Sequence, residues 1–524
     1  MRILIAEPLA SAALKLLHQR PGWEIVVSNP KEYKQHLAEA DALIVRSAVM
    51  VDAGVLAAAP KLRVIGRAGV GVDNIELPAA TAAGVLVMNT PGGNAVSVAE
   101  HTIALMLSLA RSIPNASASV KAGKWEKRKF MGTELRGKTL GVVGLGSIGR
   151  EVVKRAAAFE MRIIATDPYV HSQTAKDVGV ELVTLPELYA LSDYITLHTA
   201  LTPESNRMFS RDAFAQMKKG VRIVNCARGE LIDEEALKEA LASGQVGGAA
   251  LDVFEIEPPD PGDPLLAMEN FVGTPHIGGS TEEAQAIVGV RIVEQVMEYL
   301  TSGVAVNAVN MPALTPEQYR ALGPYSVLAQ RLGHFASQIS KGNPKTVRLI
   351  YFGKIAELNT HLVRNAGLAG VLQRSMAGKA NAVNAMQIAG DRGLTVAERH
   401  DKRVAHTDTV QLELETDAGI TTVEGAVVLD RPRLIHVDGI YCEAPLDGNI
   451  VFLKNEDVPG VIGFIGGVLG KNGINIATFS LGRRAEGGEA VSVIETDQPV
   501  PDNLLADLLK NPAVKSARAV QFPH

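Results

Sequence analysis

The chain of 524 residues has only two cysteines, Cys226 and Cys442, and they lie far apart. This scarcity excludes a disulfide-stapled scaffold or a cysteine-rich zinc site, and it predicts a reducing, cytoplasmic environment. No apolar run approaches the ~18 residues that a membrane-spanning helix needs. The short apolar start at residues 1–6 predicts a buried first strand rather than a signal peptide.

Neither sign of charge dominates, because 52 basic residues face 57 acidic ones and the net charge is −5. This balance argues against a globally basic nucleic-acid binder, although it leaves room for a local cationic pocket. With 47% apolar and 21% charged residues, the chain is not predominantly disordered. At roughly 100–200 residues per domain, its length predicts three or four domains.

The first ~100 residues alternate short aliphatic strands with amphipathic helices, which is typical of a parallel α/β domain. A long helix is predicted over 96–112, ending at Pro114. A second α/β block follows to about residue 284, and a helix over 284–301 plausibly returns the chain to the first domain. The strands predicted across both blocks are 3–6, 25–28, 42–46, 64–66, 139–143, 162–166, 194–197, 222–225 and 249–253.

Beyond Asn310 the pattern changes, and residues 311–447 mix helix and strand signals without a recognisable chemical motif. A compact tail begins near Asn449. It is predicted to contain a strand over 450–454, a turn at 457–460, a helix over 461–471 and a strand over 474–481.

The clearest motif is Gly144-x-Gly146-x-x-Gly149, together with Ser147 and Ile148, between a predicted strand and a predicted helix. Its glycines allow a tight turn, close approach of a pyrophosphate and close helix packing. Asp167 ends the next strand at the distance expected of a ribose-binding carboxylate. Because a carboxylate repels a 2′-phosphate, NAD is favoured over NADP as the cofactor.

Three downstream segments each place one chemically useful side chain near a strand end: Arg228, Glu257 and His276. Histidine titrates near neutral pH and can remove a hydroxyl proton, a carboxylate orients the ring, and arginine binds a substrate carboxylate. Taken singly, each has an ordinary structural explanation. Their joint occurrence after a dinucleotide motif favours a dehydrogenase.

The chain resembles the D-isomer-specific 2-hydroxyacid dehydrogenases from about residue 1 to 310 and again over its last ~75 residues. The resemblance is carried by the dinucleotide motif, the three catalytic segments and the stretches 46–48, 67–74, 89–94 and 123–125. It implies that Arg228 binds substrate, that His276 is the acid/base and that Glu257 is its partner. It also implies further cofactor contacts at Thr199, Ala227, Asp252, Gly278 and Gly279. Val70 departs from the threonine that many relatives place near the cofactor phosphates.

Within this family, the chain most resembles the branch that oxidises D-3-phosphoglycerate to 3-phosphooxypyruvate, the first step of the phosphorylated route to L-serine. The substrate phosphate needs cations beyond Arg228. The resemblance implies Arg46 and Arg67 for this role, with Ser47 and Asn94 as further substrate contacts. Lys127 and Arg128 either reach a neighbouring subunit's active site or form a solvated basic run.

The tail resembles an ACT domain, a βαββαβ module that often binds amino acids at subunit interfaces. The resemblance implies Asp457 and Asn475 as its effector residues and L-serine as the ligand. A dimerisation module with an idle effector site is an equally open interpretation. Residues 311–447 resemble in placement the intervening domain of the longer members of the branch, which acts in assembly or anion binding.

The expected fold is α/β, with two Rossmann-like doubly wound domains, an α+β intervening domain and a βαββαβ ACT domain. The expected boundaries are 1–98 plus 285–310 for the substrate domain, 99–284 for the NAD-binding domain, 311–447 and 448–524. A homotetramer without metal, nucleic-acid or membrane partners is expected.

Three alternatives compete with this function. One is a dehydrogenase of an unphosphorylated 2-hydroxyacid, and another is an NAD-sensing scaffold. The third is an amino-acid sensor with a vestigial catalytic part. The first-domain arginines, the regulatory tail and the complete set of Arg228, Glu257 and His276 count against them.

Overall fold

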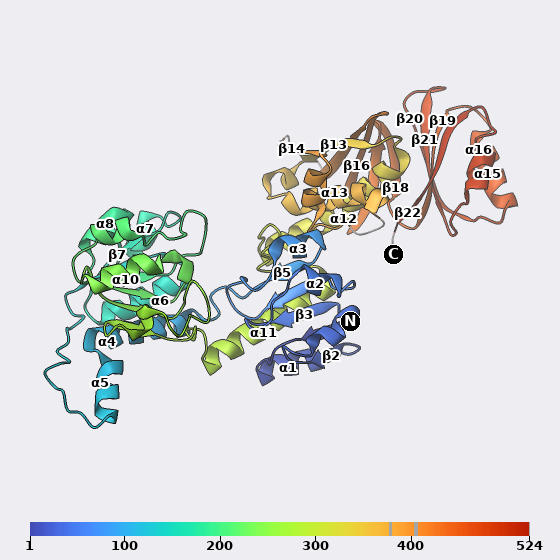
Figure 1. Cartoon of the computed structure of the whole chain (residues 1–524). Coiled ribbons are helices and arrows are strands. Elements are labelled where there is room, and N and C mark those ends of the chain that lie inside the picture. Colours follow the sequence, from blue (N-terminus) through green and yellow to red (C-terminus); the bar gives the residue numbers. More distant parts are fainter. Residues whose placement is uncertain (377–379, 403–406, 523–524) are drawn as a thin grey trace.

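A computed structural model describes residues 1–376, 380–402 and 407–522. The chain forms four β-sheets, whose strands lie within residues 2–88, 139–273, 344–445 and 449–521. In Figure 1 the second sheet and its helices lie at one end of the molecule, the first and third sheets come next, and the fourth sheet lies at the other end. The expected fold class is confirmed.

The first sheet has the strand order β2-β1-β3-β4-β5, and all its strands are parallel. The long helix α11 (Glu282–Ser302) follows the second sheet in the sequence but packs against the first sheet, as predicted for the returning helix (Figure 1). The remaining elements are β1 (Arg2–Ile5), α1 (Ser11–His18), β2 (Glu24–Val27), the 3₁₀ helix η1 (Tyr33–Glu39), β3 (Ala42–Val45), α2 (Ala53–Ala57), β4 (Val64–Arg67), α3 (Leu77–Ala82) and β5 (Leu86–Met88).

The second sheet is also fully parallel, in the order β12-β11-β10-β9-β6-β7-β8. Strand addition reverses direction at β6, which leaves a crevice between the carboxyl ends of β6 and β9 where such folds bind ligands. Its elements are α4 (Ala95–Arg111), α5 (Ile113–Lys121), β6 (Thr139–Val143), α6 (Ser147–Ala158), β7 (Arg162–Thr166), α7 (Ser172–Asp177), β8 (Glu181–Leu182), α8 (Leu185–Leu191), β9 (Tyr194–Leu197), α9 (Arg211–Gln216), β10 (Val221–Asn225), η2 (Gly229–Leu231), α10 (Glu234–Ala242), β11 (Val246–Leu251), η3 (Pro264–Ala267) and β12 (Phe271–Gly273).

Two local predictions were wrong in detail. The helix α4 ends at Arg111, and Pro114 lies in the first turn of a second helix, α5, instead of closing the first one. Proline is tolerated there because its missing N–H would have no partner in the first turn. The strand β11 begins at Val246, before the predicted start at 249, because Gly248 already pairs with β10.

The third sheet is mixed, in the order β14-β13-β15-β16-β17-β18, and the fourth is antiparallel, in the order β20-β21-β19-β22. The last six elements follow the expected βαββαβ order. The elements of this half are α12 (Pro316–Ile339), β13 (Pro344–Phe352), η4 (Lys354–Glu357), α13 (His361–Met376), α14 (Ala385–Asp391), β14 (Thr395–Asp401), β15 (Thr409–Thr416), β16 (Gly419–Val428), β17 (Arg431–Val437), β18 (Ile440–Pro445), β19 (Asn449–Glu456), α15 (Val461–Lys471), β20 (Ile476–Arg483), β21 (Glu489–Thr496), α16 (Asp502–Leu508) and β22 (Val514–Gln521).

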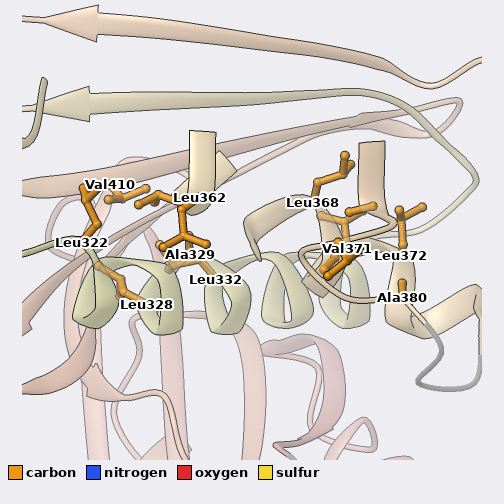
Figure 2. Packing of buried hydrophobic residues seen from close by; sticks show 14 of the residues in the cluster. Leu322, Leu328, Ala329, Leu332, Leu362, Leu368, Val371, Leu372, Ala380 and Val410 are labelled. Carbon is orange, nitrogen blue, oxygen red and sulfur yellow. The ribbon is translucent and has the colours of Figure 1, made fainter. Parts of the chain in front are cut away.

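The helix α12 joins the third and fourth sheets into one hydrophobic core. Figure 2 shows Ala329 of α12 beside Leu362 of α13, whereas Leu328 points away from α13. A Cβ on Gly425 of β16 would lie 2.8 Å from Leu328, so this side of α12 packs against the third sheet. Further along the same helix, the ring of Phe335 lies 5.6 Å from that of Phe452 in the fourth sheet, in an edge-to-face arrangement. The fourth sheet therefore packs against α12 through Phe452 and β22, and against β18 through β20 and β21.

Within the part of the chain that the structure describes, no single helix is long and apolar enough to cross a membrane. The bent pair α4–α5 meets the length and composition test only when its two helices are taken together.

Candidate active site

Most of the predicted catalytic and cofactor residues border one cavity between the two parallel sheets; Glu257 lines an adjoining cavity, and Gly144, Gly149 and Asp167 line neither. The main cavity, of about 470 Å³, is bordered by loops that follow the carboxyl ends of several strands. Predicted residues that line it are Arg67, Asn94, Gly146, Ser147, Ile148, Thr199, Ala227, Arg228, Asp252, His276, Gly278 and Gly279. Side chains from positions 67 to 279 thus share one space because parallel strands deliver them to the same edge.

The dinucleotide motif has the geometry that a pyrophosphate requires. Gly146 caps the N-terminus of α6 without a side chain, so the first N–H groups of that helix remain open to an anion. A Cβ at position 149 would lie 2.1 Å from the carbonyl oxygen of Gly144, which means that only glycine permits this close packing of helix and strand. These features fit NAD.

Asp167 lies directly after β7, beside the motif. Its carboxylate accepts hydrogen bonds from the backbone N–H of Leu145 at 2.8 Å and of Tyr169 at 2.9 Å. These contacts hold the carboxylate at the edge of the cofactor crevice, which is the position that a ribose hydroxyl would meet.

Sequence reasoning missed His198, which follows β9 and lines the same cavity. Its Nε2 pairs with the hydroxyl of Thr196 at 2.9 Å, while its Nδ1 is buried and has no hydrogen-bond partner among the described residues. Burial lowers the pKa of His198 to about 3, so the ring is neutral at physiological pH. The position of this histidine beside the cofactor crevice becomes visible only in the tertiary structure.

Asp252 is almost completely buried and organises the loop that carries His276, the predicted acid/base. Its carboxylate accepts hydrogen bonds from the backbone N–H of Ile277 at 2.9 Å and of Gly278 at 2.7 Å. Burial alone would raise the pKa of Asp252, but these bonds and those from His101 and the Thr274 hydroxyl outweigh burial and lower it. A permanent carboxylate therefore holds residues 277–278 in place.

His276 and Glu257 form the predicted pair. The Nδ1 of His276 lies 2.8 Å from a carboxylate oxygen of Glu257, which leaves Nε2 available to a substrate. His276 has a φ of +53°, a left-handed conformation that is uncommon outside glycine and often found at functional sites. The histidine is also half exposed, as a residue that meets substrate must be before binding.

Arg228 extends from the second sheet across to the first, where its guanidinium pairs with Asp73 at 2.8 Å. Any side chain at position 71 would collide with this arginine, because a Cβ there would lie 2.0 Å from its Nη2. Asp73 lies in the stretch 67–74, and the sequence alone did not indicate its role. In the structure it holds Arg228 in the cleft.

An adjoining cavity of about 350 Å³ carries the predicted anion contacts. It is lined by Arg46, Ser47, Arg67 and Asn94, and it reaches His276 and Glu257. Burial and the nearby charge of Arg228 lower the pKa of Arg67. Among the residues that the structure describes, Arg67 Nε and Asn94 Oδ1 are buried without a hydrogen-bond partner, as polar atoms of a ligand-binding site can be.

Lys127 and Arg128 do not reach this chain's own cleft. They lie on an exposed segment after α5 and border a separate shallow hollow with Trp125, which is 84% exposed. The interpretation that they serve a neighbouring subunit stays a prediction.

The two effector candidates lie at opposite ends of β20. Asp457 pairs with Arg483, the last residue of that strand, at 2.7 Å. Asn475 immediately precedes the strand and donates to Asp497 at 2.8 Å. One chain does not bring them together, so a joint site requires two copies.

Three family models match the chain in order. Residues 103–278 match the D-isomer specific 2-hydroxyacid dehydrogenase NAD binding domain, residues 321–438 the D-3-phosphoglycerate dehydrogenase intervening domain, and residues 449–513 the ACT domain. The second and third matches cover the half of the chain in which sequence reasoning found no catalytic motif.

Solved structures resemble the chain over part of its length. D-lactate dehydrogenase from Escherichia coli is 30% identical, with a TM-score of 0.53 over 59% of this chain and 100% of its own. NAD-dependent formate dehydrogenase from Staphylococcus aureus in complex with NAD is 30% identical, with a TM-score of 0.52 over 57% of this chain and 96% of its own. The dehydrogenase fold and the NAD dependence follow from these likenesses and the family model.

Full-length relatives complete the assignment. D-3-phosphoglycerate dehydrogenase of Methanocaldococcus jannaschii is 43% identical, and that of Bacillus subtilis is 38% identical, each over 100% of both chains. The chain therefore belongs to the D-3-phosphoglycerate dehydrogenases, a branch of the D-isomer-specific 2-hydroxyacid dehydrogenase family.

Proposed function

We propose that the chain oxidises D-3-phosphoglycerate to 3-phosphooxypyruvate, with Arg228, Glu257 and His276 as the catalytic residues. The observation that carries these roles is the 2.8 Å pair of His276 and Glu257 in a cleft that Arg228 enters from the second sheet. The reaction is the first step of the phosphorylated route to L-serine.

The substrate binds between the two parallel sheets. Arg228 binds its carboxylate by charge-assisted hydrogen bonds, while Arg46, Ser47 and Arg67 receive the phosphate in the adjoining cavity. Closure of the cleft excludes water and orients the C2 hydroxyl toward His276.

His276 removes the proton from the C2 hydroxyl at Nε2, because Glu257 occupies Nδ1. The carboxylate of Glu257 stabilises the resulting imidazolium and fixes the ring orientation. Bound NAD⁺ supplies the acceptor for the hydride that leaves C2. In the reverse direction, the imidazolium returns its proton to the carbonyl oxygen of the ketoacid.

The fourth sheet and its helices act as a regulatory ACT domain in a homotetramer, with L-serine as the effector. Asp457 of one copy and Asn475 of a second copy form the effector site. This arrangement follows from their separation along β20 and from the ability of both side chains to bind an amino acid's ammonium and carboxylate groups.

The enzyme works in the cytoplasm. Both cysteines are free and buried, as a reducing environment allows. Burial raises the pKa of the Cys226 thiol to about 12, so it is unreactive at neutral pH.

The first test is NADH oxidation with 3-phosphooxypyruvate and with hydroxypyruvate, each in the presence and absence of L-serine. We expect kcat/KM to be at least about 10²-fold higher for the phosphorylated ketoacid, which corresponds to about 2.7 kcal/mol of differential transition-state binding. Serine should lower the rate.

Comparable rates on both ketoacids would instead assign a broader hydroxyacid dehydrogenase. Binding of NADH without turnover of either ketoacid would contradict the catalytic proposal and favour an NAD-sensing scaffold.

A further inference from the structure

A buried carboxylate lies behind the loop that carries Arg46. Glu7 follows β1, is only 5% exposed, and accepts three backbone hydrogen bonds from the neighbouring loop. One oxygen binds the N–H of Arg46 at 2.8 Å and of Val49 at 3.0 Å, and the other binds the N–H of Ala48 at 3.2 Å. The N–H of Ser47 is the one in this stretch that Glu7 does not bind.

The carbonyl groups of the same loop are held from the other side. The Nδ2 of Asn74 donates to the carbonyl oxygen of Arg46 at 2.8 Å and to that of Val49 at 2.7 Å. Asn74 is itself buried. Two side chains from other parts of the chain therefore fix residues 46–49, while Ser47 remains exposed along the smaller cavity.

Topology explains why these groups meet. In the first sheet, β1 lies between β2 and β3, so strand addition reverses direction there and a crevice opens between the carboxyl ends of β1 and β3. In open parallel sheets this crevice is where a ligand normally binds. Here Glu7 occupies it and uses the loop N–H groups that would otherwise meet an external anion.

We propose that Glu7 is a positioning residue for phosphate recognition: by taking the N–H groups of Arg46, Ala48 and Val49, it turns Ser47 and the Arg46 side chain toward the substrate phosphate. This inference rests on the proposed function, because it assigns the smaller cavity to the phosphate. It adds to that function a residue that does not touch substrate.

The effect of Glu7 differs from that of a simple nearby charge. A negative charge behind the phosphate site would by itself weaken phosphate binding, so removing it would lower KM. Positioning predicts the opposite result. In Glu7→Gln the amide oxygen still accepts from Arg46 and Val49, but the amide NH₂ faces the N–H of Ala48, and the peptide beside Ser47 must move.

The experiment measures kcat and KM for 3-phosphooxypyruvate, hydroxypyruvate and NADH in the full-length wild type and in Glu7→Gln. We expect KM for 3-phosphooxypyruvate to rise about tenfold, the equivalent of about 1.4 kcal/mol of lost binding. The kcat, the KM for NADH and the kcat/KM for hydroxypyruvate should change by less than about twofold, because only the phosphate contact is disturbed.

Asp41→Asn is the matched control. Asp41 is a carboxylate in the same sheet that accepts a backbone N–H, that of Arg2 at 2.6 Å, but it precedes β3 and so lies at the sheet edge away from the cleft. It should leave all kinetic constants unchanged even if stability falls. If Glu7→Gln does not fold, Asn74→Leu tests the same loop from its carbonyl side and should raise the same KM.

An unchanged or lowered KM for 3-phosphooxypyruvate in folded Glu7→Gln would overturn the inference, as would an equal loss with hydroxypyruvate. Failure of the proposed function appears separately, as a wild type that does not prefer the phosphorylated ketoacid.

Discussion

The candidate active site between the two parallel sheets and the candidate effector pair of the fourth sheet differ in how close together the fold places their residues. In the parallel sheets, every loop after a strand reaches the same edge, so residues as distant as Arg67, Arg228 and His276 line one cavity. In the fourth sheet, Asp457 and Asn475 are separated by only 18 positions, yet they lie at opposite ends of β20.

The physical reason is the end of the strand at which each residue lies. Loops that follow parallel strands all lie at one edge of the sheet. The strands β19 and β20 are both antiparallel to β21 and therefore parallel to each other, but Asp457 follows β19 whereas Asn475 precedes β20, so the two residues lie at opposite edges. A parallel sheet can therefore complete a site within one chain. The fourth sheet has one candidate residue after a strand and the other before a strand, so a second copy must supply one of them to a joint site.

The largest effect is expected in the candidate active site, where distant residues meet. His276→Ala should lower kcat at least about 10²-fold, because it removes the acid/base group, while the Kd of NADH changes little. Steady-state kinetics and NADH fluorescence titration measure the two quantities. His18→Ala, on the exposed side of α1, is the control. Near-normal turnover of His276→Ala would refute its role.

The second prediction concerns Asp457 and Asn475, the candidate effector residues. Asp457→Ala and Asn475→Ala should each raise the half-inhibitory serine concentration about tenfold or more, since each removes one polar contact of about 1.4 kcal/mol. When the two variants are mixed under conditions that exchange subunits, interfaces between unlike copies regain one intact site. Serine inhibition should then return in part.

A mixture that stays as insensitive as either variant alone would show that each effector site lies within one chain. The effector site would then be complete within one chain, as the candidate active site is.

The smallest effect concerns His198 in the crevice after β9. Its pKa is lowered by burial to about 3 in the folded state, against 6.5 in the unfolded chain. The unfolded state therefore binds the proton more tightly, and the stability contribution is complete above pH 6.5 and declines as pH falls toward 3. The slope is about 1.4 kcal/mol per pH unit.

Urea unfolding at pH 6.5 and 5.5 measures this loss, and His198→Asn should reduce it by about 1 kcal/mol. His18→Asn should not. An unchanged slope in His198→Asn would mean that the ring is hydrated and titrates normally in the folded protein.

Much of the fold could be predicted because local patterns are strong in the parallel sheets. The strands at 139–143, 162–166 and 194–197 match their predicted bounds, since each is a short apolar run bounded by turns. The second half was harder. In the third sheet, β15 alternates buried and partly exposed residues, but β13, β14 and β16 do not alternate regularly. The helices α12 and α13 pack against this sheet, and the sequence does not reveal those contacts.

The amino-acid sequence by itself determined which chemistry the chain carries: the glycine motif, the acidic strand end at Asp167 and the set of arginine, glutamate and histidine. These signals are local, because each depends on residue type and on spacing along one strand–loop unit. The tertiary structure alone decided the surroundings of Glu7, Asp73 and His198, and the separation of Asp457 from Asn475. Those depend on which strand ends are neighbours in space, and sheet order sets that only after the chain has folded.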